Sequence, residues 1–365
     1  MIEVQFTNDL LAWYDASRRE LPWRQNPEPY SVWVSEIMAQ QTQIDRVVRY
    51  YERWMEQYPD VGSLARAHEE DVLKLWEGLG YYSRARNMLK AANVIVQGHG
   101  GEFPTDYADI RGLPGVGEYT AGAICSIAFG QSEPAVDANV LRVFARLLDL
   151  EGPVREAKGR SRVEKQVRAL IPNDRAGDFN QAVMELGALV CTKSPNCEDC
   201  AVQQYCRARD AGTVSQRPVL PASKKTVRIT MATGVLVHEG RFLIQKRQPD
   251  DVWPGLWEFP GGGIEEGETP EQAVVREYME EVELAVEPIQ TITTLVYTYT
   301  RYRVTMHCLL CRFAEEPREP VFNEAVEGGF MLPAELDSYA FPSGHRRLVE
   351  FMKNDKTFDA LFSDI

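Results

Sequence analysis

The stretch Leu113-Pro114-Gly115-Val116-Gly117, followed by Glu118-Tyr119-Thr120, joins two predicted helices in the first half of the chain. Gly115 and Gly117 stand two positions apart, so the backbone can approach a ligand closely here. The helix that follows would point its free N–H groups towards an anion. Taken alone, the stretch fits a phosphate-gripping turn and an ordinary glycine-rich helix turn equally well.

The residues on both sides of this stretch have the apolar spacing of helices with short connections. Helices are expected at 6–14, 32–55, 72–79, 87–96, 120–129, 139–148, 161–170 and 179–190. After a proline-containing linker at 212–226, strands are expected at 228–237, 241–247, 289–299 and 302–313, with a helix at 270–283. The sequence therefore predicts a multidomain protein, with an all-α domain over 1–211, an α+β domain over 227–355 and a tail at 356–365.

Four of the seven cysteines lie within sixteen positions, at Cys191, Cys197, Cys200 and Cys206. Short loops between thiolates can return each sulfur to one small volume, as a metal centre requires. The spacing alone leaves three alternatives open: two disulfides, a tetrahedral zinc ion or an iron–sulfur cluster. Disulfides are disfavoured because no signal peptide is visible at the N-terminus, and a cytoplasmic location is expected.

The composition is that of a globular protein, with no run of eighteen apolar residues that would span a membrane. The net charge of −14 argues against a simple nucleic-acid binder. The charge is uneven, however, because residues 219–365 carry 15 Lys and Arg against 24 Asp and Glu, and residues 1–218 carry 25 against 30. A local basic face in the first half is therefore compatible with the composition.

The glycine hairpin and the cysteine quartet together resemble the endonuclease III superfamily of helix-hairpin-helix DNA glycosylases, in which the quartet holds a [4Fe–4S] cluster. Three segments, at 33–42, 78–87 and 135–140, resemble MutY-type adenine DNA glycosylases. Two departures stand out: the first gap of the quartet has five residues where six is usual, and Ala138 stands where glycine is common. The resemblance covers residues 6–210.

The resemblance implies a catalytic role for four residues. Cleavage of a purine N-glycosidic bond needs a proton for the leaving base and an anion beside the cationic sugar. Glu36 would be the acid that protonates adenine at N7, and Asp137 would stabilise the cation or attack the anomeric carbon. Tyr119 would hydrogen-bond near both, and Asn139 would orient water or the carboxylates. From the residues alone, Glu36 could be a solvated helix acid and Asp137 a helix N-cap.

The resemblance also implies contacts with DNA, from which the target base must be extruded. Tyr82 and Gln41 would wedge into the duplex and fill the gap, Gln40 belongs to the same segment, and Gly115 and Gly117 would hold a phosphate. Arg24 and Glu185 would read adenine. Tyr82 could equally be a core aromatic residue.

Tyr119 occupies the position where bifunctional relatives carry a Schiff-base lysine, so base removal without strand cleavage is expected. The implied partner is double-stranded DNA with adenine opposite 8-oxoguanine or guanine, bound by a monomer.

Residues 262–281 resemble a Nudix box, Gly262-x5-Glu268-x7-Arg276-Glu277-x2-Glu280-Glu281, although Glu283 stands where glycine is usual. Glu277, Glu280 and Glu281 share one helical face, which suits Mg²⁺ or Mn²⁺ as well as an ordinary acidic surface. The α+β domain is therefore expected to have the Nudix fold. MutY-type proteins usually carry a degraded box that recognises 8-oxoguanine, whereas this box is similar to those of diphosphatases that hydrolyse 8-oxo-dGTP.

Two interpretations of the second half follow. It is an active pyrophosphatase, or it is a domain that recognises the DNA lesion and retains the residues of the Nudix box. For the whole chain, three alternatives to an adenine glycosylase stay open. They are a nucleotide diphosphatase whose helical half tethers it to DNA, an endonuclease III-like glycosylase/lyase, and a non-catalytic DNA-binding module. Tyr119 and Glu36 disfavour the second, and the two acid constellations disfavour the third.

Overall fold

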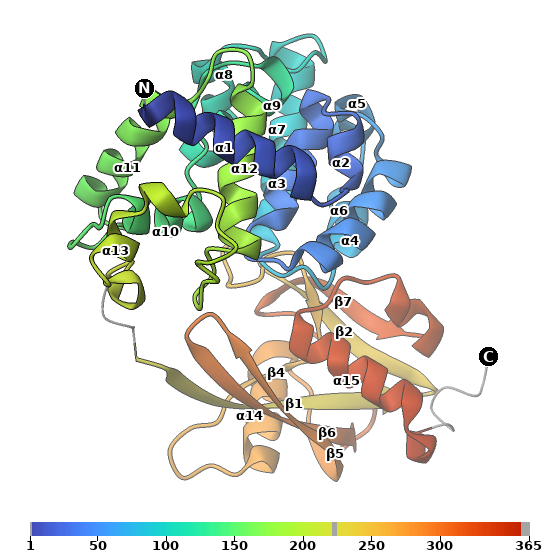
Figure 1. The fold of residues 1–365 in the computed structure, drawn as a ribbon. Coiled ribbons are helices and arrows are strands. Elements are labelled where there is room, and N and C mark those ends of the chain that lie inside the picture. The colour runs from blue at the N-terminus through green and yellow to red at the C-terminus, as the bar shows by residue number, and fades with distance from the viewer. Residues whose placement is uncertain (1, 221–224, 359–365) are drawn as a thin grey trace. The chain divides into compact units, whose positions relative to one another are not determined.

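The computed structural model describes residues 2–220 and 225–358, in two compact units (Figure 1). The first unit comprises residues 1–67 and 86–222, and the second comprises 68–85 and 223–365. In the described residues, no helix is long and apolar enough to cross a membrane.

The first unit is built from helices. Their bounds are α1 Ile2–Ser17, α2 Pro22–Gln25, α3 Pro29–Ala39, α4 Ile44–Gln57, α5 Val61–Ala65, α7 Ser83–Gly98, α8 Tyr107–Gly112, α9 Glu118–Phe129, α10 Ala138–Leu147, α11 Ala157–Leu170, α12 Ala176–Leu189 and α13 Arg207–Asp210. Short 3-10 turns follow at Gln203–Tyr205 and Val214–Gln216. A core shared by α1, α10, α11 and α12 includes the fully buried Leu10, Phe144 and Phe179. Burial of such side chains stabilises the unit by about 1.5–3 kcal/mol each.

The apolar spacing predicted one continuous helix over residues 32–55. The chain instead forms two helices there, α3 and α4. The chain breaks between α3 and α4, where Gln41 adopts a left-handed backbone with φ 58°. Both helices bury an apolar face, so their periodicity runs through the break and hides it in the sequence. The break leaves Gln41 exposed in a loop at the C-terminal end of α3.

The first part of the linker predicted at 212–226 is ordered. Residues up to Leu220 pack on the first unit through a bridge between Pro153 and Val219. Arg217 is buried, and its Nε lies 2.8 Å from Oδ1 of Asp149. Residues 221–224 lie outside the described part of the chain.

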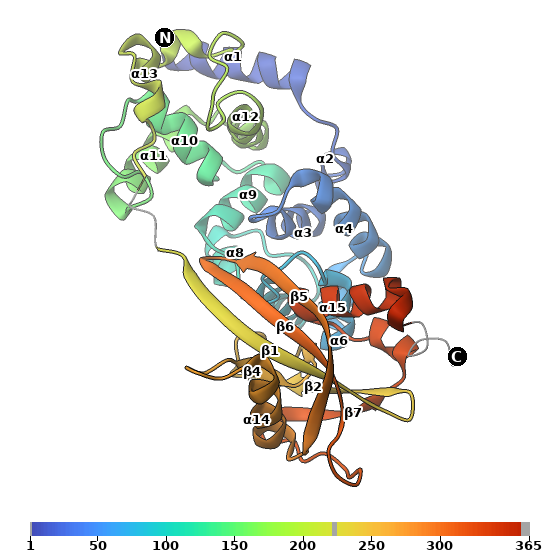
Figure 2. The ribbon, with the colours of Figure 1, turned by 90° about the horizontal axis from the view of Figure 1, so that it is seen from below.

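The second unit is a sheet with a helix on each face (Figure 2). Its strands are β1 Val227–His238, β2 Arg241–Arg247, β3 Trp257–Glu258, β4 Gly261–Gly263, β5 Val286–Tyr299, β6 Tyr302–Phe313 and β7 Ala325–Met331. The order is β3-β2-β1-β6-β5, with β4 paired to β1 and β7 to β2. β1 and β6 run parallel, with Val235 opposite Leu310.

The helices of the second unit are α6 Glu69–Trp76, α14 Pro270–Val282 and α15 Ser343–Asn354, with 3-10 turns at Pro333–Asp337 and Lys356–Phe358. α14 buries Val274, Tyr278 and Val282 against one face of the sheet. α15 buries Leu348, Val349 and Met352 against the other. α14 begins at a capping box between Thr269 and Gln272, which fixes the helix start beside the β4 glycines.

Candidate active site

Glu36 lies near the C-terminal end of α3, and its carboxylate faces the first turn of α9. The hydroxyl of Tyr119 donates a hydrogen bond to its Oε2. Burial raises the pKa of Glu36 to about 7, the hydrogen bond from Tyr119 lowers it, and the negative charge of Asp137 raises it. Glu36 is therefore a carboxyl that carries a proton near neutral pH, as a general acid requires.

Asp137 is the N-cap of α10, so the structural role that the sequence left open is present. Its Oδ1 accepts a hydrogen bond of 2.7 Å from the backbone N–H of Val140, and its Oδ2 accepts one of 2.7 Å from Nδ2 of Asn139. Burial raises the pKa of Asp137, and these hydrogen bonds counteract it. The cap leaves the carboxylate fixed in position beside the cavity.

Asn139 links Asp137 to Arg142 through hydrogen bonds. Its Oδ1 accepts a hydrogen bond of 2.8 Å from Arg142, whose guanidinium also donates to the carbonyl oxygens of Gly187 and Cys191 at 2.7 and 2.8 Å. The side chain of Asn139 is therefore locked in one orientation. Arg142 carries no sequence signal of its own and was not predicted.

One cavity of about 700 Å³ brings most of the predicted residues together. It is lined by Glu36, Tyr119, Asp137 and Asn139, and by the predicted base and DNA contacts Arg24, Gln40, Gln41 and Glu185. These residues come from loops and helices that are far apart in the sequence. Met184 also lines the cavity, with its Sδ 3.3 Å from the hydroxyl of Tyr119, and was missed because methionine at a helical position indicates only a core residue.

Glu185 and Arg24 are paired with each other, and a third residue, Arg19, completes the group. Arg24 Nη2 lies 2.9 Å from Glu185 Oε2, and Arg19 donates to both carboxylate oxygens at 2.9 Å. Burial would raise the pKa of Glu185, but the hydrogen bonds from Arg19 and Arg24 lower it to about 2. Glu185 is thus a buried anion, and its charge is fixed at the wall of the cavity.

The hairpin has the geometry that a close backbone contact requires. Gly115 has φ 76°, and a Cβ there would lie 2.6 Å from Cβ of Asn87. Gly117 is the N-cap of α9 and makes no side-chain cap, and a Cβ there would meet no atom within 4 Å. The N–H groups of α9 are therefore uncovered at an open surface.

Tyr82 belongs to the second unit and is buried there, with 7% exposure. Its hydroxyl donates a hydrogen bond of 2.9 Å to the carbonyl oxygen of Phe341. This burial is compatible with the core role that the sequence left open. The neighbouring Tyr81 is half-buried and has φ 51°, and its ring lies 5.9 Å from that of Tyr299.

The four cysteines are free thiols that line one small apolar cavity, together with Val143, Leu147, Leu186 and Val202. Arg146 Nη1 lies 3.2 Å from Sγ of Cys191. No three His, Cys, Asp or Glu side chains of the described residues are close enough to hold a single metal ion. Thiols spread around a cavity fit a cluster better than one tetrahedral ion, and an N–H donor to sulfur is typical of such a site.

In the second unit, the three predicted metal-binding carboxylates differ in environment. Glu281 is buried and accepts hydrogen bonds from the N–H of Gly261 at 2.9 Å and from Gln245 at 3.0 Å. Glu277 and the exposed Glu280 both accept hydrogen bonds from Arg276, at 2.9 and 3.0 Å. The three do not converge on one point in the described structure.

A fourth acid, Glu258 on β3, extends this group. It is buried and forms an ion pair with Arg247. Burial raises the pKa of Glu258 to about 7 and that of Glu281 to about 9, and the charge of Glu258 adds to the shift at Glu281. A buried acid whose charge raises the pKa of a second buried acid creates a site that a divalent cation would neutralise. Glu258 lies outside the periodic pattern of α14, so that pattern does not reveal it.

Comparisons with known proteins agree with both units. Residues 34–173 match the family model "HhH-GPD superfamily base excision DNA repair protein", and residues 232–351 match "NUDIX domain". An adenine DNA glycosylase of Buchnera aphidicola from Acyrthosiphon pisum is 30% identical over 315 residues, which cover 86% of this chain and 88% of that protein. A thermostable thymine-DNA glycosylase of known structure is 26% identical, with a TM-score of 0.53, and the match covers 57% of this chain and 97% of that one.

Longer relatives also match. The human adenine DNA glycosylase is 38% identical over 310 residues, and the Arabidopsis thaliana protein is 37% identical over 292 residues. The matches cover 70% and 69% of this chain. This chain spans 57% of the human protein and 46% of the plant protein, or about half the length of these relatives.

Proposed function

The chain belongs to the adenine DNA glycosylase family, and we propose that it hydrolyses the N-glycosidic bond of adenine opposite 8-oxoguanine or guanine in duplex DNA. The observation that carries the proposal is the pair of acids in one cavity. Glu36 has a pKa of about 7, and Asp137 is fixed by Val140 and Asn139. Departure of a purine requires a proton donor for the base and an anion beside the sugar.

The residues have separate tasks in this reaction. Glu36 donates its proton to N7 of the extruded adenine while the bond from N9 to the sugar breaks. The carboxylate of Asp137 stabilises the positive charge on the sugar, and Asn139 holds that carboxylate in place. Tyr119 hydrogen-bonds Glu36 and, as a phenol, forms no Schiff base, so the DNA strand stays intact.

The buried Glu185 gives the cavity its selectivity for a purine with an amine at C6. Its carboxylate is held by Arg19 and Arg24. An anion fixed at the cavity wall by two arginines attracts the N–H₂ at C6 of adenine and repels the carbonyl oxygen that guanine places there.

On the DNA side, the open N-terminus of α9 at Gly117 binds a backbone phosphate. Gln41 stands exposed in the loop after α3, where it can enter the space that the base leaves. For the wedge we favour Tyr81 over Tyr82, because Tyr82 is buried and its hydroxyl is occupied by Phe341.

The four cysteines are proposed to hold a [4Fe–4S] cluster, which would supply structural support to the loop at 191–206. Through Arg146 and Arg142, this loop connects to Asn139 and so to Asp137.

For the second unit, we propose hydrolysis of 8-oxo-dGTP or a related nucleoside triphosphate with Mg²⁺ or Mn²⁺. The buried Glu258 and Glu281 favour this over a lesion reader alone, because burial raises the pKa of both and a divalent cation would stabilise their ionised forms. Glu277 and Glu281 would hold the metal ion, which activates water for attack on phosphorus.

Two assays on the purified full chain test these proposals. The first measures adenine released from duplexes with adenine opposite 8-oxoguanine or guanine, with Glu36→Gln against the exposed Glu56→Gln on α4. We expect release by the native chain and by Glu56→Gln, loss of about a thousandfold or more with Glu36→Gln, and strand breaks only after alkali. Equal release by both variants would contradict the role of Glu36. The second assay measures pyrophosphate from 8-oxo-dGTP with Mg²⁺, and no release would leave lesion recognition as the function of the second unit.

A further inference from the structure

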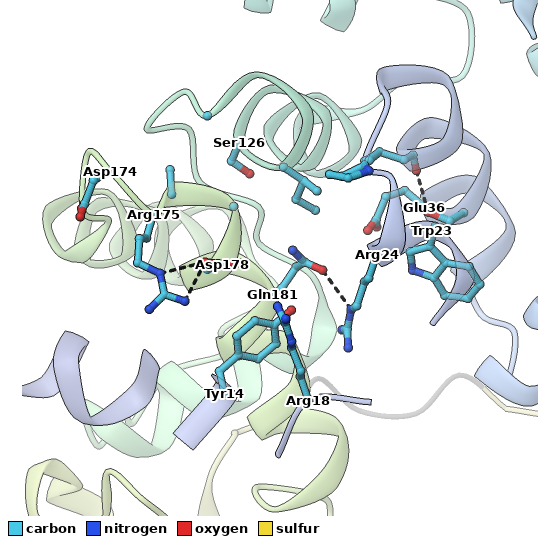
Figure 3. Close-up of a pocket in the computed structure, with 17 residues that line it drawn as sticks. Tyr14, Arg18, Trp23, Arg24, Glu36, Ser126, Asp174, Arg175, Asp178 and Gln181 are labelled. Atoms are coloured by element: carbon cyan, nitrogen blue, oxygen red, sulfur yellow. Dashed lines mark hydrogen bonds and ion pairs between the residues drawn. The ribbon is translucent and has the colours of Figure 1, made fainter. Parts of the chain in front are cut away.

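A second cavity lies behind Glu36 in the first unit (Figure 3). Its volume is about 230 Å³, and it shares Trp23, Arg24, Ser35, Glu36 and Gln181 with the larger cavity. Its remaining lining comes from Pro27 and Val32 and from residues in or next to α1, α9 and the start of α12. Glu36 is therefore accessible from two sides, and only the larger side carries Tyr119 and Asp137.

The far end of this rear cavity is polar and reaches the surface. Arg175 and Asp178 form an ion pair there, and Asp174 and Arg18 are exposed (Figure 3). The rear cavity thus extends from the exposed Arg18 and Asp174 to Glu36.

One buried group in the rear cavity lacks a partner. Tyr14 on α1 is fully buried, and its hydroxyl has no hydrogen-bond partner in the described protein atoms. Arg18 and Arg24 lie over its ring and do not reach the hydroxyl as donors. An unpartnered buried hydroxyl costs about 1–3 kcal/mol, so a polar cavity of this size is expected to hold ordered water against it.

We infer that the rear cavity binds water and supplies the molecule that completes hydrolysis at Glu36. This inference rests on the proposed glycosylase function. Extruded adenine and its sugar would lie in the larger cavity beside Tyr119 and Asp137, so the rear cavity offers water a separate approach to Glu36. After Glu36 has given its proton to the base, a water from the rear cavity adds its oxygen to the anomeric carbon. One of its protons returns to the carboxylate of Glu36, and the other stays on the new sugar hydroxyl.

The proton and oxygen balance closes in this scheme. One water is consumed for each base released, and Glu36 ends the cycle protonated. Tyr14 acts as a positioning residue, since it holds water and does not touch the reacting atoms.

Variants of Ile127 on α9, which lines the rear cavity and not the larger one, test this inference. Ile127→Phe would fill the rear cavity, and Ile127→Ala would widen it. With excess protein on mismatched DNA, we expect Ile127→Phe to slow formation of the hydrolysed abasic sugar about tenfold at unchanged DNA affinity, and Ile127→Ala to keep the native rate. Equal rates for both variants, with the native chain active, would overturn the inference about water and leave the proposed glycosylase function standing. A native chain that releases no adenine would instead overturn the proposed function.

Tyr14→Phe gives a readout that does not depend on activity. If water binds the hydroxyl, removal of the hydroxyl leaves that water short of a partner, and the thermal unfolding temperature falls or is unchanged. A rise in that temperature would show that the hydroxyl is dry and would contradict the inference. A crystal structure of the native chain is expected to show water within hydrogen-bond distance of Tyr14, and an empty cavity there would also contradict it.

Discussion

The hydroxyl of Tyr119 donates a hydrogen bond to Glu36, although the two residues lie 83 positions apart on different helices. This contact lowers the pKa of a carboxyl that burial raises to about 7. Tyr119 thus tunes the carboxyl that we propose as the general acid.

The pH dependence of base release follows from this contact. The protonated form of Glu36 is active, so the rate is expected to fall as pH rises through about 7. Tyr119→Phe removes a hydrogen bond that stabilises the ionised form, so the pKa of Glu36 rises and the alkaline limb moves to higher pH. Single-turnover rates across the pH range measure the shift, and a limb that moves to lower pH would contradict it.

The same group affects stability in a defined direction. The pKa of Glu36 in the folded protein, about 7, exceeds the ordinary value of 4.5. The contribution of Glu36 to the free energy of unfolding is therefore fully present below pH 4.5 and is lost as pH rises through 7. Urea unfolding of the native chain and Glu36→Gln measures it, and the difference between them should change across this window.

Removal of the Glu185 carboxylate should destabilise the first unit. Glu185→Gln leaves Arg19 and Arg24 without their anion, and a loss of about 2–3 kcal/mol in the free energy of unfolding is expected at neutral pH. The depressed pKa makes this stabilisation present above pH 4.5 and lost as pH falls towards 2.

The control is Glu133→Gln, which breaks the surface ion pair with the exposed Arg168. Glu133→Gln is expected to lower the free energy of unfolding by less than ~1 kcal/mol. Urea unfolding that gave equal losses for the two variants would show that the buried group contributes no more than a surface pair.

The hairpin offers a matched pair of glycines. A Cβ at Gly117 or at Gly112 meets no protein atom within 4 Å, so both alanine variants should fold, and the altered N-cap costs at most ~1 kcal/mol. Gly117→Ala should weaken DNA binding about tenfold because the Cβ occupies the approach of the phosphate, whereas Gly112→Ala should bind as the native chain does. Fluorescence anisotropy with a mismatched duplex distinguishes them, and equal affinity would remove the phosphate site from Gly117.

The second unit offers another pair. A Cβ at Gly262 would lie 2.3 Å from Oε1 of Glu277, whereas one at Gly263 meets nothing within 4 Å. Gly262→Ala should displace Glu277 and abolish metal-dependent hydrolysis of 8-oxo-dGTP, and Gly263→Ala should preserve it. If both variants retained hydrolysis, Glu277 would not be a metal ligand.

The sequence by itself determined the local chemistry of this protein. The hairpin at 113–117, the cysteine spacing and the three acids of α14 follow from short-range rules, because turn geometry and helical periodicity are local properties. The same rules predicted most helices and strands, and the family resemblance pointed to Glu36 and Asp137.

Only the tertiary structure decided which of these groups meet. Arg19 joins Glu185 across 166 positions, Tyr14 is left with an unpartnered hydroxyl, and Tyr82 is buried, a choice that the sequence left open. Burial and long-range hydrogen bonds depend on packing between elements distant in sequence, so no local pattern encodes them. For the same physical reason the pKa of Glu36 could not be read from α3, because it is set by desolvation and by Tyr119 and Asp137 on other helices.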